Sequence, residues 1–208
     1  IEILGSHSLP RLSIVSFVVR HPGPEGSRRY LHHNYVVALL NDYFERMTAA
    51  VRNHGGEILK FVGDAMLAIF PTANGGAAPA CRAALAAATE AVAAMNAWNA
   101  ERSILGEPAV RFGIAIHMGD VVYGNIGGTD RLDFTVIGSA VNRVARMEAL
   151  TKPLGCCVLV SQSVAQNADG LVSCGAHRLR DVQEAVELFT LKDLSRDEEL
   201  GAPSSGER

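Results

Sequence analysis

Two short stretches of the chain carry side chains whose types and spacing suit chemistry on a phosphate ester. In residues 139–150, which we predict to be helical, Asn142 and Arg146 stand four residues apart and share one helix face. A guanidinium held there offers a planar fork of donors to a phosphate whose charge grows in a transition state, and an amide one turn earlier suits a sugar oxygen. The solvent face of any amphipathic helix can carry the same pair, so the pair alone does not decide its role.

The second stretch runs from Lys60 to Asp64. Residues 57–60 and 65–70 predict two short strands, and Gly63 between them permits a tight hairpin tip that projects the Asp64 carboxylate. A ligand could reach a carboxylate placed in this way. Taken singly, Lys60 would be an ordinary exposed lysine and Asp64 an ordinary turn residue.

The elements that must position these groups follow from periodicity and turn residues. The β-branched and aromatic run 11–20 predicts a buried strand. From about residue 30 to 53 apolar positions recur every three or four residues, which predicts an amphipathic helix ending at His54-Gly55-Gly56. Residues 80–102 are rich in alanine and predict a long, closely packed helix.

The second half of the chain predicts further strands. Runs 109–117 and 120–126 predict a hairpin turning at Met118-Gly119, and residues 129–133 an exposed arm. A strand at 157–160, a short helix at 162–166 and a last strand at 186–192 complete the expected elements. Helices interleaved with hairpin strands indicate an α+β layered fold, and the polar segment 195–208 is expected to be disordered.

Composition bounds the function classes. The 208 residues (22.1 kDa) are 48% apolar, which is enough for one main domain with a packed core. A net charge of −3 provides no basic field for a nucleic acid. The four cysteines show no metal-binding spacing, so we expect reduced thiols in a cytoplasmic protein. No stretch has the apolar length of a signal peptide or a membrane span.

Five ordered blocks together resemble the catalytic domain of class III adenylate and guanylate cyclases. The resemblance covers about residues 36–193 and indicates a cyclase homology domain at 36–194. It implies a ferredoxin-like nucleotidyl cyclase fold with an antiparallel-rich sheet, and active sites formed between two chains. It also implies attack of a ribose 3′-hydroxyl on the α-phosphate, with release of pyrophosphate and two metal ions held by two aspartates. The blocks are residues 37–44, 54–56, 60–64, 113–119 and 134–146.

The resemblance assigns roles position by position. Asp64 matches the second metal-binding aspartate, Lys60 the adenine-reading lysine, and Thr135 a position where a subset of the family carries threonine. Asn142 matches the amide that orients the ribose, and Arg146 the transition-state arginine. Lysine with threonine favours ATP over GTP, because guanine-reading members resemble a Glu and Cys combination. The implied product is cyclic AMP and the implied cofactor is Mg²⁺ or Mn²⁺.

The chain departs from the family where the first metal-binding aspartate is expected. The usual spacing back from Asp64 reaches Arg20, a cation where a cation ligand is needed. Two main hypotheses follow. The chain is an adenylate cyclase domain that works as a homodimer or as a heterodimer with another cyclase chain, or it is an impaired or regulatory half-site that needs an intact cyclase chain as its partner. Nucleotide binding without turnover is a third, weaker hypothesis.

Residues 1–42 also resemble, more weakly, a fragment from the C-terminal part of class V aminotransferases. This match brings no Schiff-base lysine motif, so it implies no aminotransferase activity. Residues 1–35 are therefore an atypical N-terminal segment. They are either foreign to the domain or a divergent strand and helix start in the same structural place.

Overall fold

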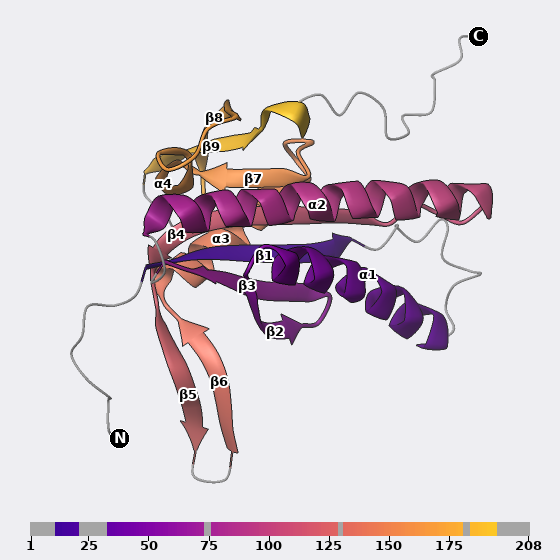
Figure 1. The fold of residues 1–208 in the computed structure, drawn as a ribbon, viewed down its shortest axis with the longest axis horizontal. Coiled ribbons are helices and arrows are strands. Elements are labelled where there is room, and N and C mark those ends of the chain that lie inside the picture. Colours follow the sequence, from indigo (N-terminus) through magenta and orange to yellow (C-terminus); the bar gives the residue numbers. More distant parts are fainter. Residues whose placement is uncertain (1–10, 21–32, 73–75, 129–130, 181–183, 195–208) are drawn as a thin grey trace.

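The computed structural model describes five segments of the chain. They hold a seven-stranded sheet, a separate two-stranded sheet, three long helices and two short helical turns (Figure 1). The segments are residues 11–20, 33–72, 76–128, 131–180 and 184–194. The expected tail 195–208 and the other parts of the N-terminal segment, 1–10 and 21–32, lie outside the described residues.

The seven-stranded sheet has the order β2-β3-β1-β4-β7-β9-β8. All neighbouring pairs are antiparallel except β4 and β7, which are parallel. The sheet is therefore antiparallel-rich, as predicted. Its strands are β1 (Arg11–Arg20), β2 (Glu57–Val62), β3 (Ala65–Pro71), β4 (Arg111–Asp120), β7 (Val158–Ser161), β8 (Leu171–Arg178) and β9 (Ala185–Leu191).

Helices cover both faces of this sheet. Helices α1 (His33–Asn53) and α2 (Ala77–Ile104) pack against each other on one face (Figure 1), and α3 (Ser139–Thr151) packs on β4 and β1 from the other. The short α4 (Gln162–Ala165) follows β7, and a 3₁₀ turn (Lys192–Leu194) follows β9. The alanines of α2 are mostly buried, because small side chains let the helix approach its neighbours closely.

Strand alternation divides the core into two clusters. Along β4, Ile114 and Ile116 join the cluster under α1 and α2, whereas Ala115 joins the cluster under α3. Successive side chains of a strand point to opposite faces, so a continuous apolar run marks a strand buried on both sides. This two-sided burial confirms the α+β fold.

The predicted hairpin at Met118-Gly119 is wrong. Both residues lie inside β4, where Gly119 is paired with Leu12 of β1. The true hairpin joins β5 (Val122–Gly128) to β6 (Arg131–Ile137), and these strands form an arm that projects away from the main sheet (Figure 1). Because β4 is buried on both faces, its backbone N–H and C=O groups need hydrogen-bond partners on both edges. Strands β1 and β7 supply these partners.

The sequence analysis also missed β8. Its sequence, Leu-Val-Ser-Cys-Gly-Ala-His-Arg, lacks a clear apolar alternation, and its pairing with β9 is interrupted by a bulge between Ser173 and Gly175. Within the described residues, no helix is long and apolar enough to cross a bilayer. Cys81, Cys156, Cys157 and Cys174 form no disulfide among the described residues.

Candidate functional site

The β2–β3 hairpin positions Lys60 and Asp64. Gly63 adopts a φ of 62°, the left-handed conformation that makes the tight tip, and Asp64 beside it is exposed. Lys60 is half-buried and is paired with Leu67 just after a register shift in β2. The exposed tip thus places a carboxylate where a ligand from outside the chain can reach it.

Helix α3 positions Asn142 and Arg146. Val144 and Met147 are buried against the sheet, so the opposite face of the helix carries the exposed Asn142 and the half-buried Arg146. At the helix start, a Cβ added to Gly119 of β4 would lie 2.8 Å from the Ala140 Cβ. The glycine therefore lets α3 sit directly on the strand.

Asn142 and Arg146 line one cavity of about 660 Å³. Across the cavity lie Arg178, at the end of β8, and Arg180. Sequence reasoning missed both arginines. The signal was the Arg-Leu-Arg pattern, in which the buried Leu179 turns both neighbours outward. Three guanidinium groups and one amide around a single cavity suit an anionic ligand rich in phosphate oxygens.

Lys60 and Asp64 do not line this cavity. Thr135 lies on β6, paired with Gly124 of β5, at the base of the arm and four residues before α3 begins. One chain therefore brings Asn142 and Arg146 together and keeps the hairpin residues outside their cavity.

Arg20 ends β1 in the middle of the sheet. The antiparallel register pairs Val18 with Ala65, the first residue of β3, so β1 ends beside the start of β3, which directly follows Asp64. On its other side, Arg20 is paired with Arg111 of β4. The register thus places a cationic residue type beside the hairpin tip, at the position where a second carboxylate was expected.

These residues fit one divalent cation better than two. Asp64 is a hard oxygen ligand of the kind Mg²⁺ shares with phosphates and water. Among the described residues, no group of three or more His, Cys, Asp or Glu side chains forms a metal-binding cluster. A metal ion at Asp64 would therefore take its remaining ligands from a nucleotide and from water.

Two buried groups have strongly shifted pKa values. Burial, with the charges of Glu148 and Asp64, raises the pKa of Tyr43 well above its ordinary value. Burial, with the charge of Arg143, lowers the pKa of His117 to about 4. His117 is therefore neutral at pH 7, and Tyr43 keeps its proton.

A chain of hydrogen bonds holds His117 under the start of α3. The Ser163 hydroxyl donates to the Met118 carbonyl at 2.9 Å, because a carbonyl only accepts. The Ser161 and Ser163 hydroxyl oxygens lie 2.9 Å apart, and Nδ1 of His117 lies 2.9 Å from Ser161 Oγ. The consistent assignment has Nδ1–H donating to Ser161 and Ser161 donating to Ser163. This network supports the strand on which α3 rests.

Comparisons with known proteins show what the chain is similar to. An adenylate cyclase from Anabaena cylindrica is 39% identical over 158 residues, which are 74% of this chain and 30% of the relative. Adenylate cyclase 1 from Rhizobium meliloti is 35% identical over 167 residues, 77% of this chain and 24% of the relative. The chain thus spans about a third or less of the length of these relatives.

The fold matches a solved cyclase. The crystal structure of the guanylyl cyclase Cya2 superposes with a TM-score of 0.73 and 26% identity, covering 88% of this chain and 92% of that one. Residues 27–184 match the family described as the adenylate and guanylate cyclase catalytic domain. That match covers most of the sequence, and the chain therefore belongs to the class III adenylate and guanylate cyclase catalytic domain family.

Proposed function

We propose that this domain converts ATP to 3′,5′-cyclic AMP and pyrophosphate in intracellular signalling. In this reaction the ribose 3′-oxygen bonds to the α-phosphorus, the bond from that phosphorus to the bridging oxygen breaks, and the 3′-hydroxyl loses its proton. The carrying observation is the cavity that holds Asn142 and Arg146 of α3 opposite Arg178 and Arg180. Its charge suits a triphosphate.

The four polar residues of the cavity each have a proposed role in this reaction. The Arg146 guanidinium stabilises the charge that grows on the α-phosphate oxygens in the transition state, and the Asn142 amide one turn earlier orients the ribose. Arg178 and Arg180, on the facing wall, neutralise the outer phosphates and the departing pyrophosphate.

The β2–β3 hairpin and the arm carry the residues that we propose for binding the adenine base and the metal ion. Lys60, with Thr135, favours adenine over guanine, because a threonine hydroxyl accepts a hydrogen bond from the adenine amino group. Asp64 would hold Mg²⁺ or Mn²⁺ together with the phosphates. When bound, such an ion supplies positive charge to the phosphate oxygens.

Because one chain keeps Asp64 outside the Arg146 cavity, we propose that the working site lies between two chains. The surface around the hairpin supports this assembly. Phe61 and Val62 are more than half exposed, and so are Val37 on α1 and Ile137 at the base of the arm. Helix α1 and strand β6 both contact β2, so these side chains lie on neighbouring elements. Exposed apolar side chains on neighbouring elements indicate a surface that a partner covers. The partner is a second copy or another cyclase chain.

Cysteines outside disulfide bonds and a nucleoside triphosphate substrate both suit the cytoplasm, where we place the domain. Nothing in the net charge of −3 favours a nucleic-acid partner. The proposed ligand is ATP itself.

The test is a cyclic-nucleotide assay of the purified chain with Mn-ATP. Arg146→Ala should lower the rate by about 10²- to 10³-fold, because it removes charge stabilisation made in the transition state. Arg82→Ala is the matched control, since Arg82 is exposed on α2, outside the cavity. Equal background signal from the unaltered chain and Arg146→Ala would remove the claim of catalysis.

Arg20 supports the second candidate function, an impaired half-site completed by an intact cyclase chain. The pairing of Val18 with Ala65 brings the end of β1 towards the hairpin tip, which supports this candidate. Arg20→Asp should raise the activity of the isolated chain many-fold if the missing carboxylate is the defect. Arg111→Asp adds the same charge on the neighbouring strand and should not. An active unaltered chain that gains nothing from Arg20→Asp would reject the half-site.

A further inference from the structure

A bulge in strand β2 determines which face of the sheet Lys60 takes. Ile58 is paired with Ala68 and Lys60 with Leu67, so Leu59 is the extra residue of the bulge. Directly paired side chains share one face of a sheet. Ala68 belongs to the core cluster under α1 and α2, whereas Leu67 belongs to the cluster under α3. The bulge therefore turns Lys60 to the face that carries α3.

Phe61, the next residue, takes the opposite face. It is paired with Met66, which is fully buried in the cluster under α1 and α2. Two residues of α1 contact this pair. The ring centroids of Phe44 and Phe61 lie 4.5 Å apart at an interplanar angle of 53°, and the Thr48 hydroxyl donates to the Met66 sulfur at 3.8 Å. Phe44 and Thr48 are four residues apart, so one face of α1 holds both strands of the hairpin.

The contact with α1 is important because β2 is an edge strand. It stands first in the sheet order, next to β3. Beyond the bulge, three register pairs join it to β3, from Lys60 to Val62, and Phe61 is 52% exposed. Short segments with few buried contacts open locally more easily than central strands do. The Phe44 ring therefore adds a contact where the hairpin has few others.

We propose that Phe44 is a positioning residue for nucleotide binding, because its ring holds Phe61 against α1 and so keeps Lys60 turned to the α3 face. Neighbouring residues of a strand point to opposite faces, so a rotation of the strand that moves Phe61 away from α1 also moves Lys60. This role rests on the proposed function, in which Lys60 binds the adenine base. The contact between the two rings does not depend on it.

Loss of the Phe44 ring should weaken base binding more than it slows the chemical step. In the proposed function, Lys60 contacts the base both in the bound substrate and in the transition state. Its displacement therefore raises KM and leaves kcat nearly unchanged. The preference for ATP over GTP should also fall, since Lys60 favours adenine. A purely structural loss of core packing would lower the amount of folded protein and leave both KM and the preference unchanged.

The first experiment is amide hydrogen exchange of the full chain, read by mass spectrometry, because it requires no activity. Phe44→Ala should raise the exchange rate of residues 59–66 several-fold, since the outer half of the hairpin opens more often. Alanine keeps α1 itself helical. Phe44→Tyr retains a ring against Phe61 and should retain the slow exchange of the unaltered chain.

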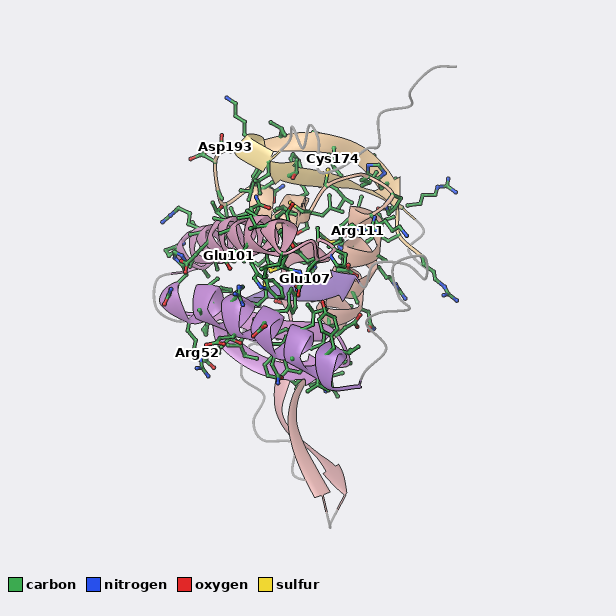
Figure 2. The ribbon with its side chains drawn as sticks, turned by 90° about the vertical axis from the view of Figure 1, so that its right-hand side faces the viewer. Arg52, Glu101, Glu107, Arg111, Cys174 and Asp193 are labelled. Carbon is green, nitrogen blue, oxygen red and sulfur yellow. The ribbon has the colours of Figure 1, made fainter. Side chains whose placement is uncertain are left out.

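Phe189→Ala is the matched control. Phe189 is also a partly buried ring packed against the cluster under α1 and α2, but it lies on β9, five places from β2 in the sheet order. Figure 2 shows Asp193, just after β9, at the top of the molecule and Arg52 of α1 at the lower left. The control removes the same ring from the same cluster, far from the hairpin, and should leave hairpin exchange unchanged.

Steady-state kinetics with Mn-ATP and Mn-GTP then test the consequence for nucleotides. Phe44→Ala should raise KM for ATP several-fold, leave kcat nearly unchanged and lower the ratio of kcat/KM for ATP to that for GTP. Phe44→Tyr and Phe189→Ala should keep the values of the unaltered chain. Size-exclusion chromatography of each variant gives its oligomeric state. An increase in KM that disappears at concentrations where Phe44→Ala is dimeric would overturn the proposal in favour of a role in assembly.

The remaining outcomes separate the proposal from the proposed function. Hairpin exchange as slow in Phe44→Ala as in the unaltered chain, or equally fast in Phe189→Ala, would overturn the positioning role. Faster exchange with unchanged KM and unchanged preference in an active chain would reject the link to nucleotide binding. If the unaltered chain makes no cyclic AMP, the proposed function fails, and calorimetry with a non-hydrolysable ATP analogue replaces KM. Weaker binding by Phe44→Ala alone would then support the positioning role, and equal binding by all variants would reject it.

Discussion

At the scale of single residues, His117 is a buried imidazole on β4, the strand on which α3 packs. Its side chain is 6% exposed, and its pKa is lowered to about 4 by burial and then by Arg143. The unfolded chain binds this proton near pH 6.5, so the neutral form stabilises the fold above that pH. The stabilisation is lost as the pH falls from about 6.5 towards 4.

The free energy of unfolding should therefore fall by about 2 kcal/mol between pH 7 and pH 5 through His117 alone. Urea unfolding at the two pH values measures it. His117→Gln is the comparison, because glutamine keeps a side-chain donor but does not titrate. An equal pH dependence in both proteins would show that the burial of His117 carries no such penalty.

At the scale of elements, the contact between β4 and α3 determines where Arg146 lies. A methyl group added to Gly119 would lie 2.8 Å from the Ala140 Cβ and 3.1 Å from Nε2 of His117. The helix or the strand would have to move, because a close-packed core has no empty space for an added methyl group. The packing of one glycine thus connects the sheet to the proposed transition-state arginine.

Gly119→Ala should lower the free energy of unfolding by about 1–3 kcal/mol through overpacking. It should also slow cyclic AMP formation, because displacement of α3 moves Asn142 and Arg146. Gly124→Ala is the control, since a Cβ there meets no atom within 4 Å. Equal melting temperatures for the two variants would contradict the close packing of Gly119 against Ala140 of α3.

At the scale of the whole molecule, the decisive feature is that the hairpin carboxylate lies outside the cavity of the helix arginine. If active sites form between two chains, Asp64→Asn chains and Arg146→Ala chains should each be inactive alone. Their mixture should recover activity, because half of the random dimers contain one site free of both substitutions.

The expected recovery is about a quarter of the activity of the unaltered chain, given free exchange of protomers. Arg20→Asp chains serve as the background if the unaltered chain is too slow to measure. Size-exclusion chromatography of each variant confirms that it still dimerises. A mixture of dimerising variants as inactive as its components would place the complete site within one chain, against the proposal.

Several predictions came from local rules that act within short stretches. Strand β1, helix α1, the β2–β3 hairpin and α3 were all predicted close to their observed bounds. Each depends on periodicity, or on a glycine such as Gly63 whose positive φ makes a tip. The pairing of β1 with β3 and β4 also supports the view that residues 11–20 are a divergent strand of this domain. The family itself was evident from the order of five blocks.

The sequence by itself determined the family, the α+β class and the residue types available for chemistry, because motif order and periodicity are properties of the chain alone. Only the tertiary structure decided which side chains meet. Strand pairing is nonlocal, so it alone put Gly119 inside β4 beneath α3 and not in a turn, and brought Arg178 and Arg180 to the cavity of Arg146.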